Sequence, residues 1–169
     1  EDHTYFVHQI RYFSRMYRVI AIDTRGHGAS PRGTAPFSIR QFAEDLLSFM
    51  DTHQLEQADI LGFSDGGNIA LTFALHYPER VDRLILNGAN LDSSGVKSSV
   101  QVPIVLGYHM ASLFSRVSVR ARKNAELLRL MVEEPHIQLE ELRKLSHRTL
   151  VIAGTRDMIR EAHTRQMVE

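Results

Sequence analysis

The sequence contains no cysteine and no tryptophan, and its 20 basic side chains are matched by 20 acidic ones. Without cysteine the chain can form no disulfide framework, thiolate nucleophile or cysteine-based zinc site, and this favours a reducing compartment such as the cytoplasm. Zero formal net charge provides no broad basic field, so nucleic acid and membranes are poor candidates for partners. The longest weakly polar stretch, residues 103–114, is shorter than the roughly 20 residues that span a bilayer.

What the sequence does contain is enough apolar material for a core. Hydrophobic residues make up 43% of the 169 residues, as in an ordinary globular domain. The first residue is Glu1, and no positively charged and then apolar leader follows it. We therefore expect the natural start, with any targeting signal, to lie upstream.

Four short apolar runs end at glycine or at a polar turn and predict β-strands. They cover residues 19–23, 58–61, 81–86 and 149–153. None alternates between apolar and polar residues, which is typical of strands that are covered on both faces of a parallel sheet.

Helices are predicted between these strands. Ser38 and Gln41 have the spacing of a capping box, with Phe37 and Phe42 placed to form a hydrophobic staple across it. Apolar residues then recur at spacings of three and four, which predicts an amphipathic helix. A second helix is predicted over residues 66–76, because the proline two positions later disfavours helical geometry before it. Alternating strands and helices predict an α/β fold with a doubly wound, mainly parallel sheet.

A polar connector at residues 92–99 interrupts this alternation, and a helical block follows it up to about residue 145. An insertion between two sheet strands would lie over the carboxyl edge of the sheet, where ligands bind in such folds. We interpret this block as a lid. The alternative is an ordinary crossover connection with additional helices.

The hexapeptide Gly-Phe-Ser-Asp-Gly-Gly at residues 62–67 lies between a predicted strand and a predicted helix. A serine hydroxyl is a weak nucleophile unless it is held out of the backbone and paired with a base. A sharp turn with small residues at Gly62 and Gly66 would expose Ser64, and the backbone N–H of Asp65 would contribute to an oxyanion hole at the helix start. The alternative is a glycine-rich turn whose surface serine anchors a phosphate, but no phosphate-loop lysine follows it.

Two further motifs complete a family pattern. Residues 23–30 (DTRGHGAS) follow the first predicted strand, and residues 154–157 (GTRD) follow the last. With the serine turn, and in this order, they resemble the α/β-hydrolase superfamily over nearly the whole chain. The hexapeptide and residues 88–90 are similar to its esterase branch, which includes valacyclovir-hydrolase-like enzymes. The resemblance implies a hydrolase core at residues 1–91 and 147–169, with a lid at residues 92–146.

The resemblance also implies roles for individual residues. Ser64 would be the nucleophile and Asp157 the acid that orients a catalytic histidine, with no metal or organic cofactor. Asp157 could instead be a helix-capping or turn aspartate. Phe63, Asp65 and His109 are candidates for substrate binding. The Asp65 carboxylate could pair with a substrate ammonium group or simply favour the helix start.

The catalytic base does not fit the pattern within this chain. The family places it after a further strand, whereas His163 lies only six positions after Asp157, in a predicted helix where we expect a surface side chain. The second oxyanion donor would come from a His-Gly loop that nothing before residue 19 resembles, since residues 5–17 look like the helix that follows it. We therefore expect a hydrolase truncated at both ends. His27 would be structural, and no pair of histidines has the spacing of a helical zinc motif.

The expected function is acyl transfer from a small ester or amide through a Ser-His-Asp triad whose histidine lies outside the chain. A carbon–carbon bond hydrolase or a cofactor-free perhydrolase would use the same triad. A non-catalytic small-molecule receptor and an inactive fragment are the remaining alternatives.

Overall fold

The computed structural model describes residues 2–168, and the chain divides into two compact units, residues 1–36 and 37–169. The first unit begins with a 3-10 helix, His3–Phe6, followed by the helix α1, Val7–Phe13. The helix predicted over residues 5–17 therefore ends four residues early. Residues 14–36 of this unit consist of turns and irregular backbone.

The strand predicted over residues 19–23 is wrong. This segment has no regular secondary structure, and the apolar side chains of Val19, Ile20 and Ile22 are exposed. An apolar run becomes a strand only when a neighbouring backbone completes its hydrogen bonds. The described residues of the first unit contain no second strand that could do so.

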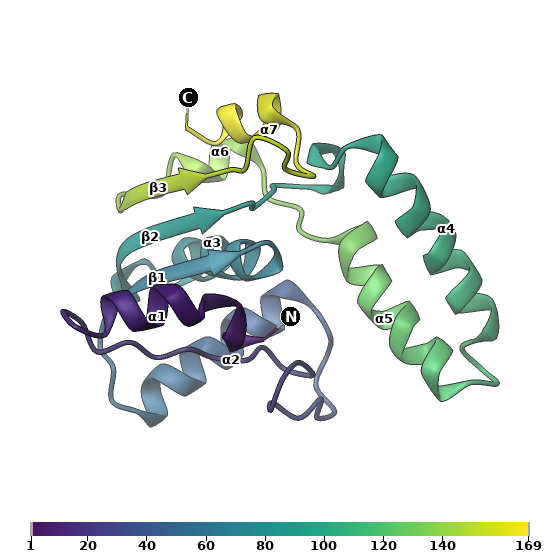
Figure 1. Ribbon diagram of the computed structural model, residues 1–169, viewed down its shortest axis with the longest axis horizontal. Coiled ribbons are helices and arrows are strands. Elements are labelled where there is room, and N and C mark those ends of the chain that lie inside the picture. Colours follow the sequence, from purple (N-terminus) through teal and green to yellow (C-terminus); the bar gives the residue numbers. More distant parts are fainter. Residues whose placement is uncertain (1, 169) are drawn as a thin grey trace. The chain divides into compact units, whose positions relative to one another are not determined.

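The second unit contains a parallel sheet with strand order β1-β2-β3. The strands are β1 (Ala58–Phe63), β2 (Val81–Asn87) and β3 (Arg148–Ile152), which confirms the other three predicted strands. Their carboxyl ends point the same way, towards the helices α4 (Ser98–Phe114) and α5 (Val119–Glu133) in Figure 1. Residues that follow the three strands are therefore brought to one edge of the sheet.

The two helices predicted between the strands are confirmed as α2 (Ile39–Thr52) and α3 (Asp65–His76). The Ser38 side chain accepts the Gln41 backbone N–H at 3.2 Å, and the rings of Phe37 and Phe42 pack edge to face with centroids 4.9 Å apart. The Gln41 side chain donates to Asp45. The Ser38 bond and the aromatic staple thus begin α2 as the sequence predicts.

A 3-10 helix, Pro78–Arg80, lies directly before β2. The other helices lie between β2 and β3 or after β3, and they are the 3-10 helix Ser93–Gly95 and the helices α4 (Ser98–Phe114), α5 (Val119–Glu133), α6 (Leu139–Leu142) and α7 (Glu161–Gln166). The long block between β2 and β3 is thus helical, as predicted. Within residues 2–168, no helix is both long enough and apolar enough to cross a membrane.

The core of the second unit lies where α3 packs against one face of the sheet and α2 packs against α3. Phe73 and Leu71 of α3 and Leu84 of β2 are fully buried there. On the other face Leu61 and Leu150 lie on either side of Ile85 in the sheet register and are 40% and 56% exposed. Coverage on both faces, which the sequence predicts, is therefore not found within this unit.

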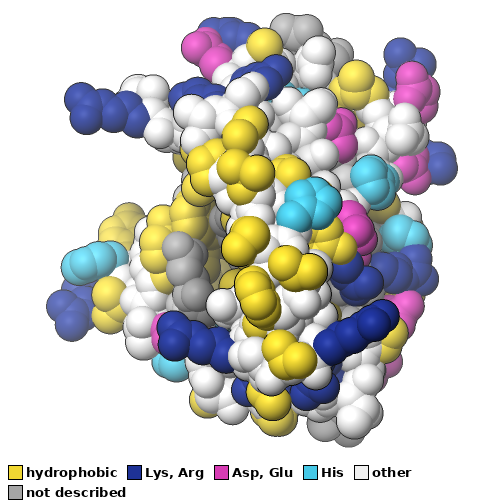
Figure 2. All heavy atoms as spheres, turned by 90° about the vertical axis from the view of Figure 1, so that its right-hand side faces the viewer, with side chains coloured by type: hydrophobic (Ala, Val, Ile, Leu, Met, Phe, Trp, Pro, Cys, Tyr) yellow, Lys and Arg dark blue, Asp and Glu magenta, His cyan; other side chains and the backbone are white. Residues whose placement is uncertain are grey.

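The helix α4 contains no lysine, arginine, aspartate or glutamate and buries none of its side chains. Figure 2 views the side of the molecule on which α4 lies and shows a band of hydrophobic side chains there. The large exposed apolar residues of α4 are Val102, Leu106, Met110, Leu113 and Phe114.

Candidate active site

The turn between β1 and α3 holds Ser64 in an unusual backbone conformation. Ser64 has φ 53° and ψ −123°, and only one other non-glycine residue among residues 2–168 has a positive φ. Its N–H donates to the Asn87 carbonyl at 2.8 Å, and its carbonyl accepts the Gly67 N–H at 2.8 Å. A positive φ in a residue with a side chain costs energy that the surrounding contacts must offset. The turn therefore fixes Ser64, half-buried, between a strand end and a helix start.

The two glycines on either side of Ser64 have different roles. A Cβ atom on Gly62 would lie 2.0 Å from the Gly66 carbonyl oxygen, so no side chain fits there. Apart from its chain neighbours and the backbone of its own helix, a Cβ on Gly66 would meet no described atom within 4 Å, whereas one on Gly67 would lie 2.9 Å from the Ala89 Cβ. The prediction that residue 66 must be small for close packing is therefore wrong. The close approach is between Gly62 and the backbone of Gly66.

Asp65 is the first residue of α3. A carboxylate at this position is favoured by the positive end of the helix dipole. This agrees with the interpretation that Asp65 favours the helix start. The backbone amides of a first helical turn lack intrahelical acceptors, which is what a contribution to an oxyanion hole needs.

A buried pair of amides connects α3 to the segment after β2. The Asn68 side chain donates to Asn90 Oδ1 at 3.0 Å and accepts the Asn90 backbone N–H at 2.9 Å. Both residues are buried. Because buried amides are costly to leave unpaired, this pair fixes the segment after β2 against the helix that begins at the serine turn.

Asp157 lies in the loop after β3, with its carboxylate beside the turn that follows β2. A Cβ on Gly88, which has φ 63°, would lie 3.4 Å from Asp157 Oδ2 and 3.6 Å from the Phe63 ring. Asp157 therefore lies near the residue that precedes Ser64. Its Oδ2 accepts the Gly154 N–H at 3.2 Å, and its Oδ1 accepts the Ile159 N–H at 3.0 Å.

These bonds bear on the alternative roles of Asp157. The residue that caps α7 is Arg160, so Asp157 is not the cap of that helix. Its carboxylate holds the loop after β3 together, as the turn interpretation requires. The Lys97 ammonium also donates to the Asp157 carbonyl oxygen, and the sequence contains no signal for this contact.

His163 differs from its predicted position at the surface. It is 8% exposed, and its Nε2 accepts the Leu91 backbone N–H at 3.0 Å. A Cβ on Gly95 would lie 2.5 Å from the His163 ring. The imidazole therefore fills a tight space and satisfies a buried amide, which is a structural role.

His109 lies on α4 and is exposed, with its ring 5.5 Å from that of Tyr108. The structure gives it no contact with Ser64 or Asp157. Its predicted role in substrate binding stays a prediction.

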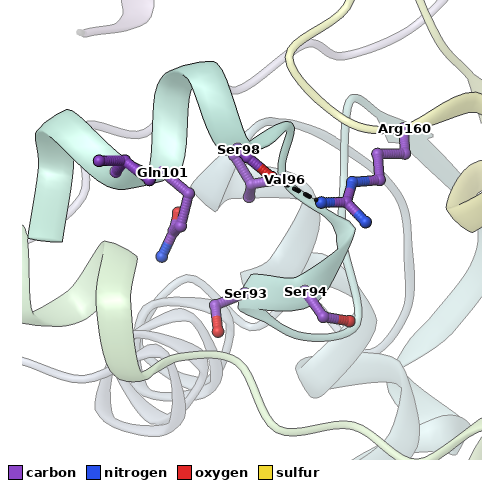
Figure 3. A pocket seen from close by; sticks show the side chains of 7 residues that line it. Ser93, Ser94, Val96, Ser98, Gln101 and Arg160 are labelled. Atoms are coloured by element: carbon purple, nitrogen blue, oxygen red, sulfur yellow. Dashed lines mark hydrogen bonds between the residues drawn. The ribbon is translucent and has the colours of Figure 1, made fainter.

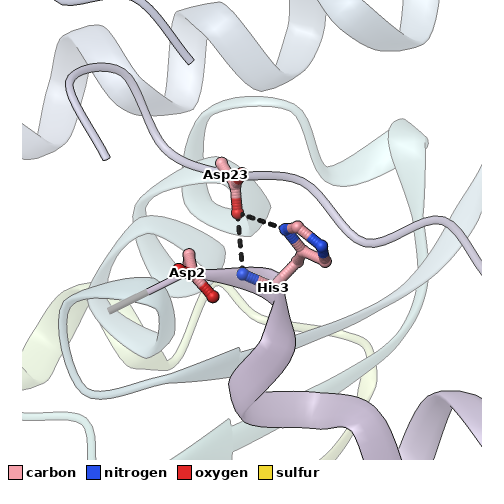
Figure 4. Close-up of side chains that lie close together, drawn as sticks. All are labelled: Asp2, His3 and Asp23. Atoms are coloured by element: carbon pink, nitrogen blue, oxygen red, sulfur yellow. Dashed lines mark hydrogen bonds and ion pairs between the residues drawn. The ribbon is translucent and has the colours of Figure 1, made fainter. Parts of the chain in front are cut away.

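The first unit contains a cluster that the sequence analysis missed, formed by Asp2, His3 and Asp23 (Figure 4). Its potential metal-ligand atoms all lie within 4.8 Å of one another. His3 bonds Asp23 Oδ1 through its backbone N–H at 2.7 Å and its Nδ1 at 2.9 Å, and Asp23 Oδ2 accepts the Ala29 N–H at 2.9 Å. Asp23 Oδ2 thus holds the turn that follows it and Oδ1 holds the 3-10 helix that contains His3, so the cluster is explained without an ion.

Those hydrogen bonds also lower the pKa of the Asp23 carboxyl. The Ala29 N–H, followed by the backbone and ring of His3, lowers the pKa of the Asp23 carboxyl to about 2. The carboxylate form is favoured because these donors bond to it.

Comparison with known proteins tests the family directly. Residues 1–116 match the family model of the alpha/beta hydrolase fold. The chain belongs to the α/β-hydrolase family. This confirms the resemblance and the fold class that the three motifs predict.

Several relatives of this chain carry names of hydrolases. It is 42% identical over 78 residues to 3-oxoadipate enol-lactonase 2 from Acinetobacter baylyi, a match that covers 46% of this chain and 29% of the relative. It is 31% identical over 142 residues to 2-hydroxymuconate semialdehyde hydrolase from Pseudomonas putida, covering 83% of this chain and 47% of the relative. The matched segments thus span less than half the length of these two relatives.

Solved structures agree on the fold. The meta-cleavage product hydrolase from Pseudomonas fluorescens IP01 matches with a TM-score of 0.75 at 25% identity, over 99% of this chain and 73% of that one. The enol-lactonase from Burkholderia xenovorans LB400 matches with a TM-score of 0.76 at 23% identity, over 98% of this chain and 74% of that one.

Proposed function

We propose that this α/β hydrolase cleaves a small ester or amide by acyl transfer, with Ser64 as the nucleophile. The observation that carries the proposal is the backbone of Ser64, with φ 53° between a parallel strand and a helix. A turn of this kind raises a serine hydroxyl above the sheet edge at the point where a helix begins. The close contact between Gly62 and the Gly66 backbone, which leaves no room for a side chain at residue 62, also supports the proposal.

The reaction assigns one task to each site residue. The Ser64 Oγ attacks the substrate carbonyl, and the backbone N–H of Asp65 donates to the oxyanion that forms. A histidine accepts the Ser64 proton, and Asp157 holds its imidazole in the required tautomer. In this proposal the histidine and a second oxyanion donor come from residues outside these 169. His163 is not assigned as the base because its Nε2 already accepts the Leu91 N–H.

Substrate recognition is assigned to Phe63, Asp65 and His109. The Phe63 ring is near Gly88, as is the Asp157 carboxylate, which supports a place for it in the wall of the site. A substrate ammonium group would pair with the Asp65 carboxylate. Residues 92–146 would act as a lid over the site. The absence of cysteine is compatible with a cytoplasmic enzyme.

The same residues could serve a second reaction, hydrolysis of a carbon–carbon bond next to a carbonyl. Relatives named as a 2-hydroxymuconate semialdehyde hydrolase and a meta-cleavage product hydrolase favour this candidate. The relative named as an enol-lactonase favours the ester reaction, because a lactone is a cyclic ester.

Turnover of p-nitrophenyl acetate tests the proposal in the natural full-length protein that carries this chain. We expect Ser64→Ala to lower kcat at least about 1,000-fold, as loss of a nucleophile does. The control is Ser146→Ala, which removes an exposed hydroxyl before β3 and should leave the rate unchanged. Equal turnover by wild type and Ser64→Ala would reject the assignment and favour a non-catalytic receptor or another nucleophile.

A further inference from the structure

The loop that carries Asp157 is joined to the segment before α4 by a short antiparallel pairing of two backbones. Two hydrogen bonds of 2.8 Å connect residues 95–97 with residues 158–160, one running in each direction. Between these bonds Val96 and Ile159 form an antiparallel bridge, and both of their side chains are buried. The pairing is therefore held by apolar contact as well as by backbone hydrogen bonds.

Two charged side chains add to this pairing. The Lys97 ammonium donates to the backbone carbonyl of Asp157, and the Arg160 guanidinium donates to Ser98 Oγ at 3.0 Å. Figure 3 looks into the pocket beside the pairing and shows the Arg160 side chain reaching Ser98 at the start of α4. We call residues 95–98 and 157–160 together the strap.

The strap fixes the loop after β3 in a way that the bonds of the Asp157 carboxylate do not. Those bonds go to the amides of Gly154 and Ile159, so they orient the carboxylate relative to its own loop. In the described part of the chain, the hydrogen bonds that join residues 157–160 to segments other than this loop and α7 all involve residues 95–98. The position of the acid therefore depends on the segment before α4 as well as on β3.

Lys97 is the residue at which the strap becomes α4. Its N–H and its ammonium both bond the loop of Asp157, while its carbonyl accepts the Gln101 N–H at 2.9 Å in the first turn of the helix. Lys97 is the N-terminal cap of α4 but makes no side-chain capping bond. Small polar side chains are preferred at that position, and a positive charge is disfavoured near the positive end of the helix dipole. The stability of α4 thus does not account for a lysine here, whereas its contact with Asp157 does.

We propose that Lys97 is a positioning residue for Asp157 and holds the acid in place from the start of the proposed lid. The inference rests on the proposed function, in which Asp157 orients the imidazole that accepts the Ser64 proton. The carbonyl that accepts the Lys97 ammonium belongs to the peptide bond directly after Asp157, so the contact restrains the backbone of the acid itself. A change in the position of α4 is thereby transmitted to the acid through a single residue.

Hydrolysis of p-nitrophenyl acetate by the natural full-length protein tests the inference. Lys97→Met removes the ammonium and keeps a long, unbranched side chain. We expect it to lower kcat roughly tenfold with little change in KM, because a misplacement of about 1 Å can cost up to about 100-fold in rate. Lys97→Arg restores a cationic donor and should recover most of the rate. The matched control is Lys144→Met, which removes an exposed ammonium after α6 and should leave the rate unchanged.

A double mutant separates positioning from a general loss of stability. In Asp157→Asn no acid remains to be positioned, so the addition of Lys97→Met should lower kcat no further. An equal loss from Lys97→Met in both backgrounds, or no loss in either, would overturn the inference. Asp157→Asn alone tests the proposed function, because an unchanged kcat would reject Asp157 as the acid and the inference with it.

Amide hydrogen exchange measures the same contact independently of the reaction. The Ile159 N–H, which donates to the Asp157 carboxylate, should exchange about threefold faster or more in Lys97→Met, the contribution of one weak hydrogen bond. Its exchange should stay unchanged in Lys144→Met. Equal exchange in Lys97→Met and in the wild type would contradict a restraint of the acid loop by Lys97, whatever the activity of the protein.

Discussion

The glycines of the serine turn should respond very differently to the same added methyl group. At Gly62 the new Cβ would lie 2.0 Å from the carbonyl oxygen and 2.3 Å from the carbonyl carbon of Gly66, both backbone atoms. Relief would require α3 to move away from β1 by more than 1 Å, because ordinary contacts begin near 3.4 Å. Overpacking a core costs typically 1–3 kcal/mol and more where backbone must shift, so we expect Gly62→Ala to cost at least about 3 kcal/mol.

At Gly66 the same methyl group meets no described atom within 4 Å beyond its chain neighbours and the backbone of its own helix. Since alanine favours helices over glycine by up to about 1 kcal/mol, Gly66→Ala should be neutral or slightly stabilising. Gly67→Ala should fall between the two, because its Cβ would contact a side-chain methyl group, that of Ala89, at 2.9 Å.

Urea unfolding of the three variants, followed by circular dichroism, measures this order. The midpoint should fall from Gly66→Ala through Gly67→Ala to Gly62→Ala, with unchanged slope. If Gly62→Ala is recovered only unfolded, the comparison of the other two still tests the packing. A Gly62→Ala variant as stable as Gly66→Ala would refute the argument that the turn depends on this close approach.

Three further changes test individual contacts. His163→Leu should cost about 1–3 kcal/mol because the Leu91 N–H loses its acceptor, whereas His109→Leu on the exposed face of α4 should leave the urea midpoint unchanged. Because the folded pKa of Asp23 is about 2 against an ordinary 3.8, its contribution to stability is complete above pH 4 and lost as the pH falls towards 2. Amide signals of residues 2–36 should follow that titration, and Asp23→Asn should abolish it. Asp65→Asn should raise KM for α-amino esters about tenfold and leave neutral esters unchanged, and equal effects on both would support the helix-start role alone.

Local signals in the sequence predict much of this fold. Ser38 and Phe37 identify the start of α2, and the proline after Tyr77 identifies the end of α3. The serine turn is predicted because its short motif is flanked by a strand and a helix, and both are found. These features depend on neighbours within a few residues, which is the range that sequence patterns describe.

Features that depend on distant contacts are not predicted. His163 is buried because Gly95 leaves room for its ring and Leu91 needs an acceptor, although both lie about 70 positions earlier. The segment at residues 19–23 has the composition of a strand, but the described residues of its own unit offer no pairing partner.

Steric requirements are also not predicted by the sequence. Gly62 and Gly66 look equivalent in the motif, and only the geometry shows that one is required and the other is not. The hydrogen bond from Arg160 to Ser98 joins residues 62 positions apart, so no spacing in the sequence indicates it.

The most direct test of the central claim is the site at which a fluorophosphonate probe attaches to the natural full-length protein. Such probes react with activated serine hydroxyls and leave a stable adduct that peptide mass spectrometry locates. The account predicts an adduct on the peptide that contains Ser64 and none in Ser64→Ala. An adduct on another serine, or none in a folded protein, would contradict it.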